Sequence, residues 1–127
     1  MNHSFIHLGL ANSMQKMGNY EFFAIVDVPD RVKTFFENQD IVNFHKIWYF
    51  HDHIRLKQQI DMEYLAAFEK KYNINLWQLA YNERIFFDFN DFYKFNYSQI
   101  ISILEQECKF FESVLEESKP DYVLLPT

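Results

Sequence analysis

The first part of the chain combines a helical apolar pattern with a short continuous apolar run. Apolar residues recur at helical spacing, namely Ile6, Leu10, Ala11, Met14 and Met17. This spacing predicts an amphipathic helix, and Gly18 stands where a helix commonly ends. Residues 22–26, with the sequence FFAIV, form a run typical of a buried strand. A helix, a glycine and a strand in this order make half of a βαβ unit.

The next segment continues with a second helical pattern and then an ambiguous stretch. Residues 29–39 predict a short helix in which Val32, Phe35 and Phe36 share one side. Residues 44–50 are apolar and aromatic but carry a histidine and a lysine, so the pattern fits either a third strand or a loop. The sequence alone leaves these two interpretations open.

Three further segments carry helical patterns. They are residues 61–73, residues 75–89, which Asn75 enters as an N-cap, and residues 96–119. The last has the clearest apolar stripe, formed by Ile101, Leu104, Cys108, Phe111 and Leu115. The opposite face is polar and consists of Gln99, Ser102, Gln106, Lys109, Glu112, Ser113 and Glu116. This division predicts which side of the helix packs on the core.

The chain ends on a second strand pattern. Pro120 prevents the preceding helix from continuing, and residues 122–125 have the apolar sequence YVLL. A short apolar run after a long helix predicts a fully buried parallel strand. We therefore expect the segments 20–28 and 121–126 to pair directly, or to flank a gap, in one sheet.

Strands that alternate with helices predict the α/β class. We expect a single Rossmann-like domain over residues 1–127, with three layers in which helices flank a small parallel sheet. No internal repeat or low-complexity linker divides the chain. If chemistry lies at the carboxyl ends of the strands, a functional loop would follow residue 127. The pattern thus predicts a domain that is incomplete at both ends.

Composition narrows the classes of function. The net charge is −6 and the sequence shows no basic stripe, which argues against a nucleic-acid partner. The chain has two glycines and no phosphate-binding glycine loop, so a dinucleotide or P-loop site is excluded within it. No apolar stretch is long enough to span a bilayer, and no signal-peptide pattern is present. Cys108 is the only cysteine, which predicts a buried thiol in a reducing compartment. These features favour a cytoplasmic protein.

Two polar motifs are candidate sites. The motif HDH at residues 51–53 supplies two imidazoles and a carboxylate, and His45 could complete a zinc set. On a strand, however, alternate residues point in opposite directions, so a polar, partly exposed loop is the better interpretation. The motif NER at residues 82–84 lies within an apolar helical pattern. It could hold a ligand, or it could form a solvated face or an internal ion pair.

The segment HSFIHLGLANSMQKMGNYEFF, which begins at His3, resembles the first loop, helix and strand of GT-B glycosyltransferases. The spacing from this histidine to Leu8, Met14 and Gly18 is similar to that of the lipid II-forming N-acetylglucosaminyltransferases. The segment ILEQECKFFESVLEESKPDYVLLPT looks like the helix and following strand of the same N-terminal domain. The stretch from NLWQLAYNERIFF to the end is most like proteins of capsular or surface polysaccharide biosynthesis.

The resemblance implies an enzyme that transfers a sugar from a nucleotide-sugar donor to a sugar or lipid-linked acceptor. It implies a catalytic role for His3 near the acceptor or the donor phosphates. It also implies a missing C-terminal domain that binds the nucleotide sugar, no cofactor within this chain, and no activity of the chain alone. Peripheral association with the inner face of the membrane would suit a lipid-linked acceptor. Alternatives are a sugar-nucleotide 2-epimerase-like or glycerophosphotransferase-like domain, or a non-catalytic α/β interaction module.

Overall fold

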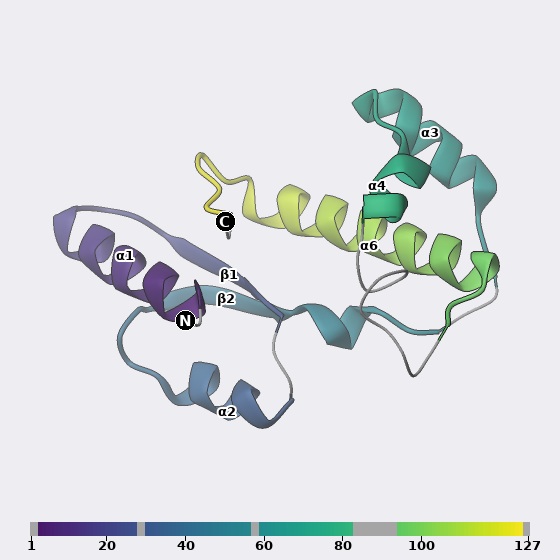
Figure 1. Ribbon diagram of the computed structural model, residues 1–127. Coiled ribbons are helices and arrows are strands. Elements are labelled where there is room, and N and C mark those ends of the chain that lie inside the picture. The colour runs from purple at the N-terminus through teal and green to yellow at the C-terminus, as the bar shows by residue number, and fades with distance from the viewer. Residues whose placement is uncertain (1–2, 28–29, 57–58, 83–93, 126–127) are drawn as a thin grey trace. The chain divides into compact units, whose positions relative to one another are not determined.

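A computed structural model describes residues 3–27, 30–56, 59–82 and 94–125, with side chains from residue 7 onward. The elements are α1 (His3–Met17), β1 (Phe22–Val26), α2 (Asp30–Asn38), β2 (Phe44–Tyr49), a 3-10 turn η1 (Phe50–His53), α3 (Met62–Tyr72), α4 (Leu76–Asn82) and α6 (Tyr97–Ser118) (Figure 1). This content is α/β, as the sequence predicts. The contacts divide the chain into two compact units, and the single domain over residues 1–127 stays a prediction. The first unit is Met1–Asp52 with Ser118–Thr127, and the second is His53–Glu117.

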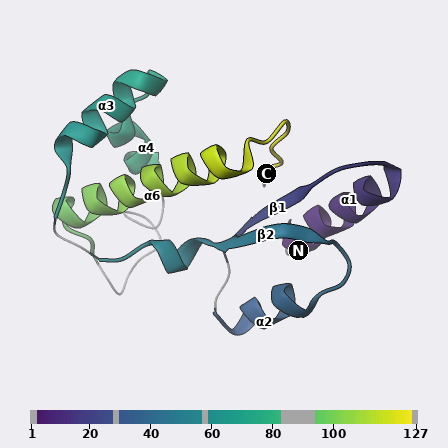
Figure 2. The same ribbon diagram turned by 180° about the vertical axis from the view of Figure 1, so that it is seen from behind.

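The first unit is built on a parallel pair of strands. β1 and β2 run side by side in the same direction and are connected through α2, as Figures 1 and 2 show from opposite sides. The register pairs Ala24 with Ile47 and Val26 with Tyr49, after an irregularity between Phe22 and Phe23. The predicted strand at 22–26 is confirmed. The ambiguous stretch at 44–50 forms a strand up to Tyr49, and Phe50 begins the 3-10 turn. A β-α-β unit with a parallel sheet is therefore present in the described residues.

One face of this sheet carries the core of the first unit. Buried residues from both helices and from the strands form one cluster, namely Leu8, Ala11, Val26, Phe36 and Val42, with Phe22, Ala24, Val32, Phe44, Ile47 and Tyr49 packed against it. Alternate strand residues point to the other face, where the rings of Phe23 and Trp48 stack at 5.8 Å. We expected helices on both faces, whereas α1 and α2 share one core.

The N-terminal helix differs from its predicted pattern in detail. α1 ends at Met17, as predicted, but Leu10 and Met17 are exposed, while Leu8 faces the core. Gly18 does not adopt a positive φ, so it does not form the left-handed cap expected of a terminal glycine. The helix face toward the sheet is thus set by packing rather than by the most apolar stripe.

Two glutamines fix the loop that leads into β2. The side chain of Gln39 accepts hydrogen bonds from the backbone N–H groups of Ile41 (2.9 Å) and Val42 (3.0 Å) and donates to the carbonyl of Val42 (2.8 Å). The N–H of Asn43 donates to Gln15 of α1 at 2.8 Å. These bonds satisfy backbone donors and an acceptor in a segment without regular structure, and they fix where β2 begins.

Polar side chains cap the helices of the second unit. Asp61 accepts from the N–H of Tyr64 at 3.0 Å to begin α3, and Asn73 ends the helix in the left-handed conformation, with φ 52°. Asn75 accepts from the N–H of Gln78 at 3.0 Å and so caps α4, as predicted. At the start of α6, Asn96 and Gln99 exchange side-chain and backbone bonds of 2.8 and 3.1 Å, which is a capping box.

The predicted face of α6 is only partly correct. Leu104 and Cys108 lie in the core of the second unit with Leu65, Leu76, Ala80, Ile100 and Ile103. Ser102, which we assigned to the solvated face, is fully buried at 0% exposure, and Gln106 is buried as well. Toward the C-terminal end, Phe111 and Leu115 are exposed while Phe110 and Val114 are buried. The error arises because the helix buries a wider face than its apolar stripe, with polar groups that find backbone partners.

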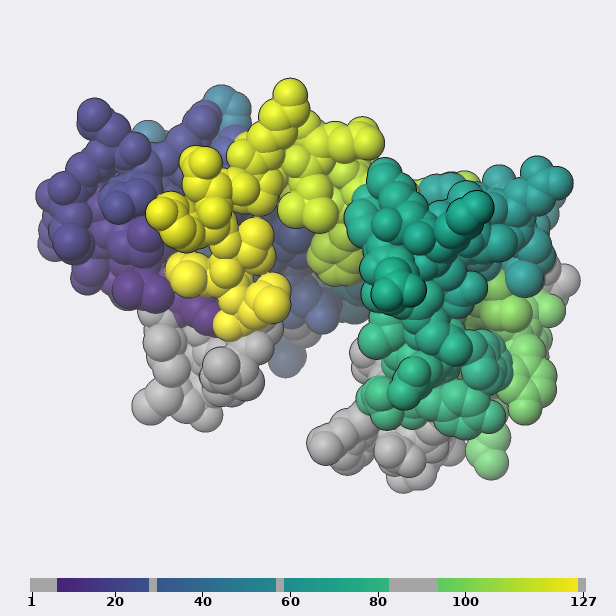
Figure 3. Space-filling view, turned by 90° about the horizontal axis from the view of Figure 1, so that it is seen from above, coloured from purple at the N-terminus to yellow at the C-terminus, as the bar shows by residue number. Residues whose placement is uncertain are grey.

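The predicted strand at the end of the chain is wrong. Residues 121–125 are neither helix nor strand, and they pair with neither β1 nor β2. Tyr122 is 80% exposed, and Figure 3 shows this part of the chain, in yellow, at the surface that faces the viewer. The pairing of 20–28 with 121–126 is therefore not found. An apolar run becomes a strand only beside a hydrogen-bonding neighbour, and sequence pattern alone cannot supply one.

Candidate functional site

The carboxyl ends of the two parallel strands bring a carboxylate and an imidazole together. Asp27 directly follows β1, and His51 lies in the turn that follows β2. Because parallel strands end at the same edge of a sheet, these residues meet, and the His51 Nε2 atom lies 2.7 Å from Asp27 Oδ1. Their side chains are 60% and 65% exposed, so the pair is open to solvent. We call this end of the sheet the carboxyl edge; it comprises Asp27, Lys33, Tyr49, His51 and Asp52.

A second ion pair lies at the carboxyl edge. The ammonium of Lys33, on α2, donates to both carboxylate oxygens of Asp52, at 2.8 and 2.7 Å. Lys33 also lies over the ring of Tyr49, 4.7 Å from its centroid. The hydrogen bond to Asp52 raises the pKa of Lys33, and the carboxylates of Asp52, Asp30 and Glu37 add to this effect. Lys33 is therefore a fixed and compensated cation.

The hydroxyl of Tyr49 is the third component of this edge. The oxygen is buried and has no hydrogen-bond partner among the residues that the structure describes. Burial raises the pKa of Tyr49, since a phenolate would lose its hydration, and the charge of Glu37 acts in the same direction. The side chain is thus a neutral phenol that leaves a donor and an acceptor unused beside Lys33.

The first pair has the geometry of an oriented base. Nε2 of His51 faces the carboxylate, so its proton is held there and Nδ1 is the nitrogen that can face a ligand. A carboxylate on one imidazole nitrogen fixes the orientation of the ring. The other nitrogen can then direct its lone pair at a bound hydroxyl group and accept its proton.

A similar pair lies at the opposite end of the strands. His45, the second residue of β2, places Nδ1 2.8 Å from Glu21 Oε1, and both side chains are 62% exposed. This pair matches the Asp27–His51 pair in chemistry, distance and exposure. It differs in position, because Glu21 precedes β1 and ligands of parallel sheets bind at the carboxyl ends. The Glu21–His45 pair is therefore a control for experiments on the Asp27–His51 pair.

The three residues of the motif HDH contact three different partners. His51 pairs with Asp27, Asp52 with Lys33, and the ring of His53 packs on Phe110 at a centroid distance of 4.7 Å. His45, the proposed further ligand, pairs with Glu21 instead. Within the described residues, no group of three or more histidine, cysteine, aspartate or glutamate side chains could hold a metal ion. The interpretation as a polar turn is the one that the geometry supports.

The other predicted site residues take different positions. His3 is the first residue of α1, and its side chain lies outside the described part of the chain. Of the NER motif, Asn82 is the exposed last residue of α4, whereas residues 83 and 84 lie outside the described residues. Cys108 is buried, as predicted, and burial raises the pKa of its thiol to about 11. A thiol of that pKa is unreactive at neutral pH.

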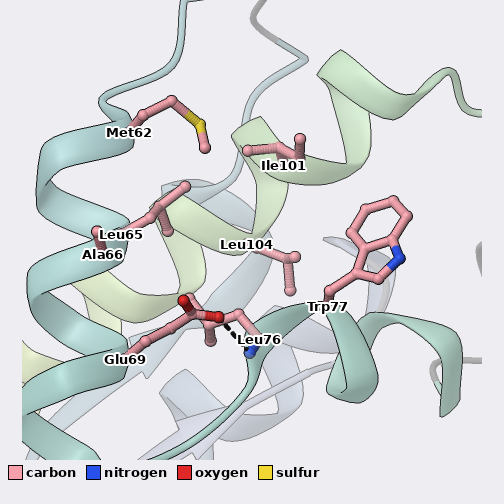
Figure 4. A pocket seen from close by; sticks show the side chains of 8 residues that line it. All are labelled: Met62, Leu65, Ala66, Glu69, Leu76, Trp77, Ile101 and Leu104. Atoms are coloured by element: carbon pink, nitrogen blue, oxygen red, sulfur yellow. Dashed lines mark hydrogen bonds between the residues drawn. The ribbon is translucent and has the colours of Figure 1, made fainter.

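The second unit contains an apolar pocket of about 150 Å³ between α3, α4 and α6 (Figure 4). It is lined by Met62, Leu65, Ala66, Glu69, Leu76, Trp77, Ile101 and Leu104. The only carboxylate in the lining, that of Glu69, accepts a bond of 2.8 Å from the N–H of Leu76 and so holds the start of α4. This pocket offers packing surface but no free reactive group.

The sequence analysis missed three residues of the carboxyl edge, namely Asp27, Lys33 and Tyr49. Asp27 carries no motif, yet it directly follows the predicted strand at 22–26, and the strand-end rule could have identified it. Lys33 gave no such signal, because its role depends on where α2 packs against the sheet. His51 and Asp52 were singled out as metal candidates, and the structure assigns them to two separate pairs.

No protein-family model, curated protein or solved structure matches this chain. In the part of the chain that the structure describes, no helix combines the length and apolar character that crossing a membrane requires. The candidate site therefore stands on its own geometry.

Proposed function

We propose that the chain is part of a glycosyltransferase-like enzyme of surface polysaccharide or lipid-linked glycan biosynthesis. It contributes the acceptor side of a Rossmann-like domain of the GT-B type. The sequence resemblance that begins at His3 suggests the family, and a parallel β-α-β unit is compatible with it. The observation that carries the proposal is the Asp27–His51 pair at the carboxyl ends of the strands.

In this proposal, His51 acts on the acceptor hydroxyl. Its Nδ1 takes the hydroxyl proton while the acceptor oxygen bonds to the anomeric carbon of the donor, and the bond from that carbon to the nucleotide diphosphate breaks. Asp27 keeps the imidazole in the required orientation. His3, at the first residue of α1, is the second candidate for the same role. Alignment of the two reactants supplies a further part of the rate enhancement.

The donor is held by another domain in this proposal. The chain has only two glycines and no loop that could surround a diphosphate, so the nucleotide sugar needs a second binding surface. The chain alone should therefore be inactive. In this proposal the acceptor is a sugar or a lipid-linked glycan. The protein acts in the cytoplasm, at the inner face of the membrane.

Calorimetry and NMR test whether this chain binds the acceptor and not the donor. We expect no micromolar binding of UDP-, GDP- or CDP-sugars to the isolated chain, since the donor site lies elsewhere. Short oligosaccharides should shift the ring signals of His51 in the wild type. The oligosaccharides should not shift the His51 signals in the Asp27→Asn variant. The Glu21→Gln variant, changed at the other end of the strands, should behave like the wild type. Micromolar donor binding, or shifts confined to His45, would refute the proposal.

A non-catalytic α/β interaction module is the second candidate. It is favoured by the exposed apolar run from Tyr122 to Leu125, a surface of the kind that protein partners cover. This candidate predicts no oligosaccharide-dependent shift at either histidine. The NMR experiment above therefore separates the two functions.

A further inference from the structure

We propose that the carboxyl edge selects a neutral sugar acceptor and rejects an acidic one. This inference rests on the proposed function and specifies its substrate class. An acidic sugar, such as a uronate or a phosphorylated sugar, needs an available cation in its site. A neutral sugar needs hydroxyl-compatible donors and acceptors. The two classes therefore make opposite demands on the charges of this edge.

The only ammonium of the carboxyl edge is already neutralised. Lys33 donates two bonds to Asp52, and Asp30 and Glu37 also act on its charge, so three carboxylates face one cation. Arg31, the other cation of α2, lies two positions before Lys33, and residues at that spacing point to different sides of a helix. Asp27 adds a further carboxylate at the end of β1. An anionic ligand would thus meet net negative charge.

The same edge carries the groups that recognise hydroxyls. The Asp27 carboxylate accepts hydrogen bonds, and His51 Nδ1 accepts one from the reacting hydroxyl. The hydroxyl of Tyr49 is buried and its ring packs against the core of the first unit, so it is not one of the groups that a ligand contacts. Acceptors, with no uncompensated ammonium among the residues of this edge that the structure describes, suit the neutral hydroxyls of a sugar, which donate hydrogen bonds.

Matched ligands test the selection. A neutral disaccharide and its uronate counterpart, of the same linkage, are titrated into the isotope-labelled chain while the shifts of His51 and Asp27 are followed. We expect the uronate to bind about fivefold more weakly, the size of one like-charge contact in water. Equal or tighter binding of the uronate would overturn this inference and leave the proposed function intact.

A charge variant makes the test specific to Lys33. In the Asp52→Asn variant, the ammonium of Lys33 loses its main partner. The affinity for the uronate, relative to that for the neutral disaccharide, should therefore rise about fivefold. Glu21→Gln removes the same charge at the other end of the strands and should leave the ratio unchanged. If both variants change the ratio equally, net charge rather than Lys33 decides, and the inference fails. Absence of binding by both disaccharides, with the fold intact by circular dichroism, would refute the proposed function as well.

Discussion

Two sets of polar side chains, one in each unit, make different kinds of contact. In His53–Glu117, buried polar groups bind backbone: Gln106 exchanges bonds of 2.7 and 2.6 Å with Arg55, and Glu105 accepts from the N–H of Asp61. In Met1–Asp52, the charged pairs of Asp27 with His51 and of Lys33 with Asp52 involve side chains alone and reach the surface. The bonds to backbone stabilise the fold, whereas the exposed pairs leave charged side chains accessible to a ligand.

This difference tells the two kinds of polar residue apart. A buried amide that pairs with backbone is costly to remove, because both partners lose their bonds away from water. Exposed ion pairs contribute little to stability, commonly below about 1 kcal/mol. Exposed charges grouped at the ends of parallel strands thus have a better explanation in ligand binding than in folding. The following predictions test that distinction, beginning with the largest effect.

Ile100→Ala should give the largest loss of stability. Ile100 is 1% exposed in the core of the second unit, so its truncation should cost about 3 kcal/mol through lost burial and the cavity left behind. Ile25→Ala, at an exposed position of β1, is the control and should cost less than about 1 kcal/mol. Hydrogen exchange should accelerate mainly in residues 53–117. Equal acceleration in β1 and β2 would show that the two units unfold together.

Gln106→Ala should destabilise the second unit by about 2 kcal/mol. The substitution leaves the N–H and carbonyl of Arg55 without their side-chain partner. Gln78→Ala, at an exposed position of α4, changes the same side chain without this loss and should be nearly neutral. Urea denaturation of the two variants measures the difference. Similar midpoints would mean that the buried amide is not structural.

Glu112 and Tyr64 should make stability depend on pH at both extremes. The 2.5 Å hydrogen bond from Tyr64, with those from Lys71 and Tyr72, lowers the pKa of Glu112 below its ordinary 4.5. Its contribution is therefore present above that value and is lost as the pH falls through the lowered pKa. Burial, with the same bond, raises the pKa of Tyr64 above its ordinary 10.0, so its contribution is lost as the pH rises beyond 10.0.

Denaturation midpoints between acid and alkaline pH check this window. Glu112→Gln should lower stability at pH 7 by about 1 kcal/mol and flatten the acid side of the profile. Glu116→Gln, an exposed carboxylate on the same helix, should leave the profile as it is. A variant profile parallel to that of the wild type over the whole range would contradict this assignment.

The smallest effect is expected at the carboxyl edge. Asp27→Asn and His51→Gln should each change stability by less than about 0.5 kcal/mol, because the pair is well exposed. The control pair, Glu21→Gln and His45→Gln, should change it equally little. Thermal unfolding in low salt is the measurement. A loss of 2 kcal/mol or more, marked by about a 7 °C drop, would mean that the Asp27–His51 pair is structural and not free for a ligand.

Much of the secondary structure follows from local sequence. The strand at 22–26 and the helices after Asp61, Asn75 and Asn96 were predictable because caps and periodic patterns act within a few residues. Two of the five residues of the carboxyl edge were also visible, since His51 and Asp52 form a conspicuous polar motif. The motif did not reveal their partners, because pairing depends on residues far apart in the chain.

The tertiary structure decided which faces and partners these elements have. The run at 122–125 has strand composition but lies exposed, because a strand needs a neighbouring edge. Ser102 and Gln106 have the polarity of solvated residues. They are buried because Gln106 bonds to the backbone of Arg55 and donates to the hydroxyl of Ser102. Asp27 meets His51 only because the two strands are parallel and end together. Sequence sets local geometry through short-range bonds, whereas burial and charge pairing are set by surfaces that exist only after the chain has folded.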